Sequence, residues 1–243
     1  MTLVDSNMSV AIVGAGIVGT ALAFRLAEAG YRVTLFDSGA PGENGPSYGN
    51  AGHIAGSDIF PLSSPGIALE GLKMLARADG PLKIVPSHLP ALIPWLLKFL
   101  RVGRGEAFET AIRAISTLCD GAVDATERLF TDAGIASMFR RVPALYVYDS
   151  ASSMAASRAG WTRKAAAGHA SREIGKAELI SLEPDLAKSF AGGTLSFDWG
   201  EVSEPFDVVQ GLFAAARSKG TTFHQAKVER ITVERGGKEP LHH

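Results

Sequence analysis

Cysteine, charge of one sign and secretory features are all scarce in this sequence, and each shortage excludes a class of protein. Cys119 is the only cysteine, which excludes an internal disulfide and a cysteine-rich metal site and leaves a small buried apolar role as the simpler expectation. The 24 basic and 25 acidic residues nearly balance and form no blocks, so no nucleic-acid-binding footprint is present. The first nine residues have neither the basic nor the apolar region of a secretory signal.

Long apolar runs are also missing. The nearest one, "LPALIPWLLKFLRVGRG", is interrupted by Pro94 and carries Lys98, whereas a membrane-spanning helix needs about 20 apolar residues. A spanning helix is therefore excluded. Because the apolar residues are followed by Arg101 and Arg104, two interpretations stay open, peripheral contact with a membrane surface and packing inside the protein.

Metal-ligand spacing is absent as well. His88, His169 and His224 are scattered along the chain without the short separations that metal sites use, so no metal site is predicted. With 46% hydrophobic and 20% charged residues among 243, the chain is long and apolar enough for one large domain or two small ones.

The clearest positive pattern is "VAIVGAGIVG", in which a short apolar strand runs into three glycines at the spacing G-x-G-x-x-G. Gly14 permits a tight turn, Gly16 lets the backbone approach a pyrophosphate, and Gly19 lets helix and strand pack closely. The start of the following helix offers unpaired N–H groups and a positive dipole end to phosphates.

The helix after the glycines is expected to turn Val18, Leu22 and Leu26 toward the core and to stop at Gly30. A second strand over residues 33–36 then ends at Asp37, at the distance where an acidic residue accepts hydrogen bonds from a ribose. Strand, glycine turn, helix, strand and acid together predict a dinucleotide-binding βαβ unit.

The segment after Asp37 does not continue like a nicotinamide-binding fold, which would add another helix and a third parallel strand. Residues 38–57 instead read "SGAPGENGPSYGNAGHIAGS", and such small residues suit close backbone approach to a flat ring system. An ordinary solvent loop is the alternative, because this composition is also that of turns.

The rest of the chain alternates short apolar segments with helix and strand patterns. Residues 106–133 predict one or two helices, "PALYVYDS" predicts a strand, and a helix begins near Pro205, followed by a strand at 221–224. "KVERITVERGGK" predicts a strand entering a Gly-Gly turn whose return strand is missing, with "LHH" left out of the fold. We therefore expect an incomplete copy of a larger fold.

In order, the segments that carry these patterns resemble the D-amino-acid oxidase superfamily of FAD-dependent oxidoreductases, and most closely its D-amino-acid dehydrogenase branch. They are "VAIVGAGIVGTALAFRLAEAGYRVTLFD", "SYGNAGHIAG", "LYVYDS", "LEPDLAKSFAGGTLSFDWGEVSEP" and "KGTTFHQAKVERI". The resemblance implies an α/β fold with a Rossmann-like FAD-binding parallel sheet and an inserted α+β substrate-cap region, incomplete at the C-terminus. The expected division is 1–64 for the FAD-binding βαβ unit and flavin-side loop, 65–199 for the cap, and 200–243 for the return to the FAD-binding domain.

The resemblance also implies which residues hold FAD. Gly14, Gly16 and Gly19 would cradle the pyrophosphate, and Asp37 would hold the adenosine ribose. Ser47, Asn50, Ala51 and Gly52 would lie beside the flavin, and Val228 would touch the adenine through its backbone. The remaining cofactor-binding positions that it implies are Ile17, Val18, Ser38 and His53.

The activity implied is oxidative deamination of D-amino acids, in which a hydride passes from the substrate Cα to the flavin and the imino acid hydrolyses to a 2-oxo acid and ammonia. A neutral amine can push the hydride off, so no strong protein base is needed and no catalytic residue is assigned. A quinone or another carrier is the expected electron acceptor. The expected location is the cytoplasm, with peripheral contact at the inner membrane face. Whether the protein forms a homo-oligomer is left open.

Several side chains have both a chemical and an ordinary interpretation. Arg140 and Arg141 could clamp a carboxylate, although exposed arginines are the commoner case. Tyr146, Tyr148 and Trp199 could line a pocket, although aromatic residues on strands more often serve packing. His53 could tune the flavin or only bond the backbone.

Three other functions stay open. Residues 45–49, "GPSYG", match the G-x-S-x-G elbow of serine hydrolases, but that motif needs a strand directly before it and a helix directly after it, and loop flanks it here. A nicotinamide-dependent dehydrogenase is disfavoured by the missing third strand after Asp37. An inactive or partner-dependent fragment of a flavoprotein is the third.

Overall fold

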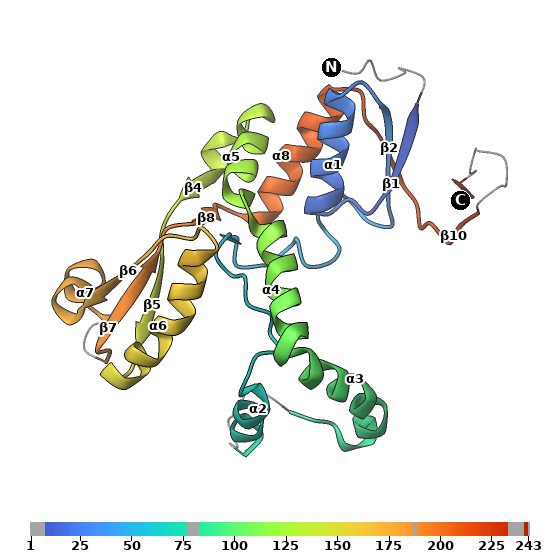
Figure 1. The fold of residues 1–243 in the computed structure, drawn as a ribbon. Helices are drawn as coiled ribbons and strands as arrows, with labels where there is room; N and C mark the ends of the chain where they lie inside the picture. The colour runs from blue at the N-terminus through green and yellow to red at the C-terminus, as the bar shows by residue number, and fades with distance from the viewer. Residues whose placement is uncertain (1–7, 77–82, 187–188, 233–240, 243) are drawn as a thin grey trace. The chain divides into compact units, whose positions relative to one another are not determined.

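The structure is a computed structural model that describes residues 8–76, 83–186, 189–232 and 241–242 of the chain. Figure 1 shows its helices and strands in chain order, and the chain divides into two compact units. Unit 1 is drawn from 1–54, 123–142 and 199–243, and unit 2 from 55–122 and 143–198. The chain therefore passes between the units several times.

Unit 1 contains the predicted βαβ element. Its strands are β1 (Ser9–Val13), β2 (Arg32–Asp37) and β9 (Thr222–Gln225), in the order β1-β2-β9 and parallel throughout. The helices α1 (Ile17–Glu28) and α8 (Pro205–Ser218) run beside each other in Figure 1. Parallel strands joined through helices are the arrangement of doubly wound α/β folds.

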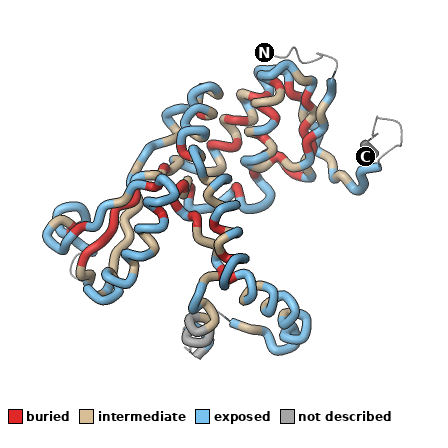
Figure 2. Tube along the Cα trace, viewed as in Figure 1, coloured by how far each residue is buried: buried red, intermediate tan, exposed pale blue. Residues whose placement is uncertain are grey.

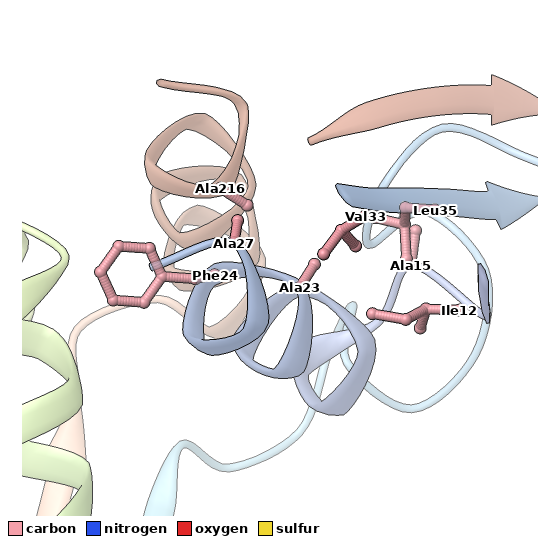
Figure 3. Close-up of a cluster of buried hydrophobic side chains, with 8 residues drawn as sticks. All are labelled: Ile12, Ala15, Ala23, Phe24, Ala27, Val33, Leu35 and Ala216. Carbon is pink, nitrogen blue, oxygen red and sulfur yellow. The ribbon is translucent and has the colours of Figure 1, made fainter. Parts of the chain in front are cut away.

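Small residues bring α1 close to its neighbours in the core of unit 1. Figure 3 shows Ala27 of α1 and Ala216 of α8 pointing toward one another. The other members of this cluster are Ile12, Ala15, Ala23, Phe24, Val33 and Leu35.

The predicted core face of α1 was partly wrong. Val18 is 77% exposed and Leu22 is 46% exposed, while Leu26 packs at the edge of the cluster. The helix is apolar on more than one side, so hydrophobic spacing alone could not select its buried face. The face of α1 with the small alanine side chains allows α8 to approach more closely, and this face is therefore the buried one.

A second layer of unit 1 joins segments that are far apart in sequence. β3 (His53–Ala55), β8 (Trp199–Val202) and β4 (Phe139–Arg141) form a sheet in the order β3-β8-β4. α5 (Ala122–Asp132) packs its Phe130 against Val208 and Leu212 of α8. A short 3₁₀ turn, η2 (Ala136–Met138), leads from α5 toward β4.

Unit 2 contains an antiparallel sheet and most of the remaining helices. The sheet is β5 (Ala144–Tyr148), β7 (Gly192–Ser196) and β6 (Ser171–Gly175), in the order β5-β7-β6. Its further elements are α2 (Ile67–Ala76), η1 (Pro86–His88), α3 (Leu89–Val102), α4 (Gly105–Cys119), α6 (Ala151–Ala166) and α7 (Lys176–Leu182). Ile174, Leu179 and Leu195 form the core between the sheet and α7.

The predicted helical stretch at 106–133 forms two helices, α4 and α5, separated at Gly121 with its positive φ of 65°. The compact units do not follow the three predicted ranges, because residues 123–142 lie within the predicted cap yet group with unit 1. The functional division into FAD-binding and cap regions stays a prediction.

The predicted absence of a return strand near the C-terminus was wrong. β10 (Arg230–Ile231) pairs antiparallel with β11 (Leu241–His242), so the first two residues of "LHH" contribute to the structure. Backbone pairing satisfies groups that a lone strand would leave open, and this favours the short ladder. The Gly-Gly turn itself lies outside the described residues.

Candidate cofactor site

The glycine turn joins β1 to α1 through very close backbone contact. Gly14 has a φ of 105°, which only glycine adopts without strain, and its N–H donates to the Phe36 carbonyl oxygen at 2.8 Å. A Cβ placed on Gly19 would lie 1.8 Å from the Gly14 carbonyl oxygen. The predicted conformational roles of these two glycines are therefore confirmed by the geometry.

Asp37 ties the end of β2 to this turn. One carboxylate oxygen accepts the Ala15 N–H at 2.7 Å, and the other accepts the Gly39 N–H at 3.0 Å. Burial acts to raise the pKa of Asp37, but these amide hydrogen bonds outweigh it and hold the pKa below its usual value. The side chain is thus a carboxylate fixed at the carboxyl end of the parallel sheet, where such folds bind ligands.

The lowered pKa of Asp37 predicts a pH-dependent contribution to stability. Because the folded pKa lies below the unfolded one, the contribution is present above the unfolded value of about 4 and is lost as pH falls through the folded value. Asp37→Asn should lower the free energy of unfolding by about 1 to 2 kcal/mol at pH 7, because charged hydrogen bonds to two amides are replaced. Urea unfolding at pH 7 and near pH 3 should show the difference between the variant and wild type shrinking in acid.

Asp120→Asn is the control for this test, since Asp120 is exposed and follows the end of α4. It should change stability by less than about 0.5 kcal/mol. An equal loss for Asp37→Asn at both pH values would contradict the assigned cause.

A cavity of about 460 Å³ opens beside the start of α1, within unit 1. Six residues that the sequence predicted as cofactor-binding line it: Ile17, Ser47, Asn50, Ala51, Gly52 and His53. The remaining lining residues, Ile54, Thr126, Leu129, Phe130, Val202, Pro205 and Val208, were not predicted. Three of these come from α5, which nothing in its sequence marks as part of a cofactor site.

Hydrogen bonds within residues 46–52 shape the rim of this cavity. The Asn50 side chain donates to the Pro46 carbonyl oxygen at 3.1 Å and accepts the Gly52 N–H at 2.8 Å. Gly52 has a φ of 69°, and its carbonyl oxygen accepts the Val202 N–H at 2.8 Å. Hydrogen bonds therefore fix the conformation of this loop, in which Ser47 and Gly52 are buried and residues 48–51 are exposed.

Ser47 is buried and its hydroxyl accepts the Ile17 N–H at 3.1 Å. It thereby bonds one of the orphan donors at the start of α1, where the N-cap residue Gly16 has no side chain to do so. Turns flank Ser47 on both sides, so the strand and helix of a nucleophile elbow are absent around it. The structure gives no support to the serine hydrolase interpretation.

The other predicted cofactor residues lie outside the cavity lining. Gly14, Gly16, Val18 and Gly19 belong to the turn and the first turn of α1, and Ser38 follows Asp37. Val228 follows β9 and is half-buried. Two residues before it, the Ala226 N–H donates to the Asp37 carbonyl oxygen at 2.7 Å, which places this segment at the same edge of the sheet as the acid.

The two candidate carboxylate clamps already bind carboxylates of the chain. The guanidinium of Arg140 donates to Glu201 at 3.0 Å, and that of Arg141 donates to Glu127 at 2.7 Å and also to Asp124. All are surface pairs, and hydrogen bonds to both acids raise the pKa of Arg141. The ordinary interpretation of these arginines is therefore favoured.

The three aromatic residues proposed to line a pocket lie in different units. Trp199 lies in unit 1, where its ring meets the His53 ring edge-on with centroids 6.0 Å apart. Tyr146 and Tyr148 lie in unit 2 and do not line the cavity. The Tyr148 hydroxyl accepts the Trp161 indole N–H at 2.7 Å.

Tyr146 belongs to a cluster in unit 2 around a buried amine, which we call the Lys164 cluster: Asp58, Phe60, Tyr146, Trp161 and Lys164. The Lys164 ammonium lies 3.0 Å from Asp58 and 4.7 Å from the centre of the Trp161 ring. The Tyr146 hydroxyl donates to the same Asp58 oxygen at 2.9 Å. Burial, followed by the Asp58 charge, raises the pKa of Tyr146.

Histidines form no metal cluster in the part of the chain that the structure describes, where no three His, Cys, Asp or Glu side chains come together. His169 is buried and its Nδ1 lies 2.7 Å from an Asp198 carboxylate oxygen. His224 stacks on Phe36. Among the described helices, none is long and apolar enough to cross a bilayer.

The residues at this edge of unit 1 fit a flavin dinucleotide. The start of α1 approaches without side chains at Gly14 and Gly16, and a Cβ on Gly16 would lie 3.0 Å from the Ser47 hydroxyl. The Asp37 carboxylate stands at the adjacent strand end. A cavity of several hundred cubic ångströms with mostly apolar walls is of the size that cofactor ring systems occupy.

Comparison with known proteins agrees with the resemblance. Residues 9–242 match the DAO family, described as FAD dependent oxidoreductase. The D-amino-acid oxidase of Bradyrhizobium diazoefficiens is 33% identical over 226 residues, covering 92% of this chain and 53% of that protein. The D-amino acid dehydrogenase 2 of Ralstonia nicotianae is 34% identical over 184 residues, covering 74% and 43%.

Among solved structures, glycine oxidase from Geobacillus kaustophilus is similar with a TM-score of 0.57 at 25% identity, over 91% of this chain and 48% of that one. The predicted fold class and the predicted cofactor, FAD, are confirmed by these matches. The chain spans about half the length of the curated relatives it matches.

Proposed function

Because the chain belongs to the DAO family of FAD dependent oxidoreductases, we propose that it provides the FAD-binding part of an enzyme that deaminates D-amino acids by oxidation. The observation that carries the proposal is the cavity beside the start of α1, lined by six residues that the sequence had marked for the cofactor. The names of the relatives, D-amino-acid oxidase and D-amino acid dehydrogenase, support the substrate class.

In this proposal different residues at the carboxyl end of the parallel sheet bind different parts of FAD. Backbone N–H groups of Gly16, Val18 and Gly19 face the diphosphate, aided by the dipole of α1, while the Ile17 N–H is held by the Ser47 hydroxyl. Asp37 and the adjoining Ser38 hold the ribose, and the Val228 backbone meets the adenine. The carboxylate of Asp37 is ionised at neutral pH and has the acceptor character that ribose hydroxyls require, and its lowered pKa keeps it ionised to more acidic pH.

The flavin ring would contact the loop of residues 47–53 and the apolar side chains beside it. Ser47, Asn50, Ala51, Gly52 and His53 present mostly backbone and small side chains to the ring. Leu129, Phe130, Val202 and Val208 add apolar walls to the cavity that the ring would occupy. Bound FAD supplies the hydride acceptor, and the imino acid product hydrolyses to a 2-oxo acid and ammonia. No residue of this chain is assigned a proton-transfer role.

An absorption spectrum tests first the proposed cofactor and then the proposed substrate. The purified chain is reconstituted with FAD, freed of excess cofactor and inspected for the flavin absorption bands. We expect retained flavin that bleaches when a mixture of D-amino acids is added without oxygen, and no bleaching with the L-enantiomers. A chain that stays colourless in excess FAD, or that binds NADH and no flavin, would overturn the proposal.

Retained flavin that no D-amino acid bleaches would confine the proposal to cofactor binding. For the electron acceptor we propose a quinone. Reduced protein should then reoxidise faster with a soluble quinone analogue than with dissolved oxygen, and the opposite order would contradict the quinone.

A further inference from the structure

The carboxylate of Asp37 receives more hydrogen bonds than those from the amides of Ala15 and Gly39. The Ser38 N–H and the side-chain amide of Asn44 also bond to it, and each of these contacts favours the ionised form. The two oxygens of an ionised carboxylate offer about four acceptor positions. Three backbone amides and one side-chain amide therefore fill the acceptor positions of this carboxylate.

Gly39 leaves the space in which the Asn44 side chain lies. A Cβ placed on Gly39 would stand 2.1 Å from Asn44 Nδ2 and 3.0 Å from its Cγ, and the shorter of these separations is closer than side chains in proteins come. The amide group of Asn44 therefore lies directly over the Gly39 backbone, where it reaches the Asp37 carboxylate. Only a residue without a side chain at position 39 permits this contact.

The turn that carries Asn44 is anchored by bonds of its own. Gly42 has a φ of 81°, and its N–H donates to the Ala15 carbonyl oxygen at 3.0 Å. The Gln210 side chain, on α8, donates to the Pro41 carbonyl oxygen. These bonds hold the backbone of the turn independently of the Asn44 amide, so the amide can leave the carboxylate while the turn stays in place.

Of the four donors, the Asn44 amide is the one that can leave without moving the backbone. The strand β2 is largely buried, as its red course in Figure 2 shows, and the buried Ala15 and Gly39 have N–H groups fixed by the main chain. The Ser38 N–H likewise belongs to the main chain. Asn44 is exposed, and its amide is carried by a side chain that rotates about two bonds.

A ribose hydroxyl that bonds to Asp37 needs one of these filled acceptor positions. We propose that the Asn44 amide holds the acceptor position that the adenosine ribose takes, so that nucleotide binding exchanges the amide for a hydroxyl. This inference rests on the proposed function, which assigns the ribose to Asp37. Asn44 then orients the carboxylate while no nucleotide is bound, and it lowers the affinity for the adenosine half because the ligand must displace it.

Titration of the full chain with ADP tests the exchange, because ADP carries the ribose and the diphosphate without the flavin. Asn44→Ala removes the competing donor, so calorimetry should show ADP binding about threefold to tenfold more tightly to the variant than to the wild type. The probe 2′,3′-dideoxy-ADP lacks both ribose hydroxyls, and its affinity should be the same for both proteins. A gain that requires the hydroxyls separates competition at Asp37 from a general change in the turn.

Gln225→Ala is the matched control. Gln225 lies opposite Asp37 on β9 and also has an exposed side-chain amide, which donates to the Ser38 carbonyl oxygen at 3.4 Å. This variant should bind both nucleotides within about twofold of the wild type. Since both substituted side chains are exposed, circular dichroism should show each variant folded.

Nuclear magnetic resonance gives a readout of the exchange itself. The side-chain amide signals of Asn44 are identified by their loss in Asn44→Ala. They should shift on adding ADP, because the amide passes from a carboxylate to water, and should shift much less on adding the dideoxy compound.

Unchanged or weaker ADP binding by Asn44→Ala would overturn the inference, and weaker binding would make Asn44 a ligand contact instead. An equal gain for ADP and the dideoxy compound would also overturn it. A wild type that retains FAD and does not bind ADP would do the same while leaving the proposed cofactor in place. A failure of D-amino acids to bleach the flavin would count against the proposed activity alone, because ADP contains no flavin.

Discussion

Gly19→Ala should abolish FAD retention and lower the free energy of unfolding by about 3 kcal/mol or more. The added Cβ would lie 1.8 Å from the Gly14 carbonyl oxygen and 3.6 Å from the Ile12 side chain, where no flexible group can move aside. The first turn of α1 must therefore shift away from β1, and the N–H groups proposed to face the diphosphate shift with it. Urea unfolding and quenching of FAD fluorescence measure the two effects, and FAD affinity should fall at least about a hundredfold.

Gly49→Ala is the control for this substitution. Gly49 lies in the same cofactor-side region with an ordinary φ, and a Cβ there would meet nothing within 4 Å. We expect less than about 0.5 kcal/mol of change in stability and unchanged FAD affinity. Full FAD retention by Gly19→Ala with a wild-type unfolding midpoint would show that the turn is not the closely packed element described here.

Lys164→Ala should destabilise the protein by about 2 to 4 kcal/mol. The Lys164 side chain is 8% exposed, and its ammonium lies near the rings of Trp161, Tyr146 and Phe60. The substitution removes these cation–π contacts, the packing of the buried stem and the partner of Asp58. The ion pair is the smaller part, because the Asp58 side chain is 51% exposed and screened by water.

Two further variants separate these contributions. Lys164→Met keeps an unbranched apolar stem and loses the charge, so about half of the destabilisation should return. Lys176→Ala removes an exposed lysine at the start of α7 and should cost less than about 0.5 kcal/mol. If Lys164→Ala behaved like Lys176→Ala in urea unfolding, the buried amine would contribute nothing to the stability of this unit.

Local patterns in the sequence predicted the βαβ unit well. The turn at Gly14, the acid at Asp37 and the start of α8 near Pro205 depend on backbone conformations and spacings that neighbouring residues set by themselves. The loop after Asp37 was also recognised, because its small residues and the position of "SYGNAG" match a known family pattern. Five of its predicted residues line the cavity.

The sequence was least informative where packing partners are distant. The exposed Val18 and Leu22 were expected in the core, because α1 is apolar on several sides and only the closeness of α8 selects the alanine face. The bond from the Ile17 N–H to Ser47 joins residues 30 apart, and no local signal announces it. The return strand at Leu241–His242 is two residues long, which is too short for any periodicity to show.

By itself the sequence determined that the protein binds a dinucleotide, because the glycine spacing and the acidic strand end are local requirements of that ligand-binding turn, and FAD was implied by the resemblance of its ordered segments to a known family. Only the tertiary structure decided what closes the cavity beside that turn. Thr126, Leu129 and Phe130 reach it from a helix more than a hundred residues along the chain from Ile17. Their place follows from the packing of α5 on α8, where apolar surface is removed from water, and such contacts leave no fixed spacing in a sequence.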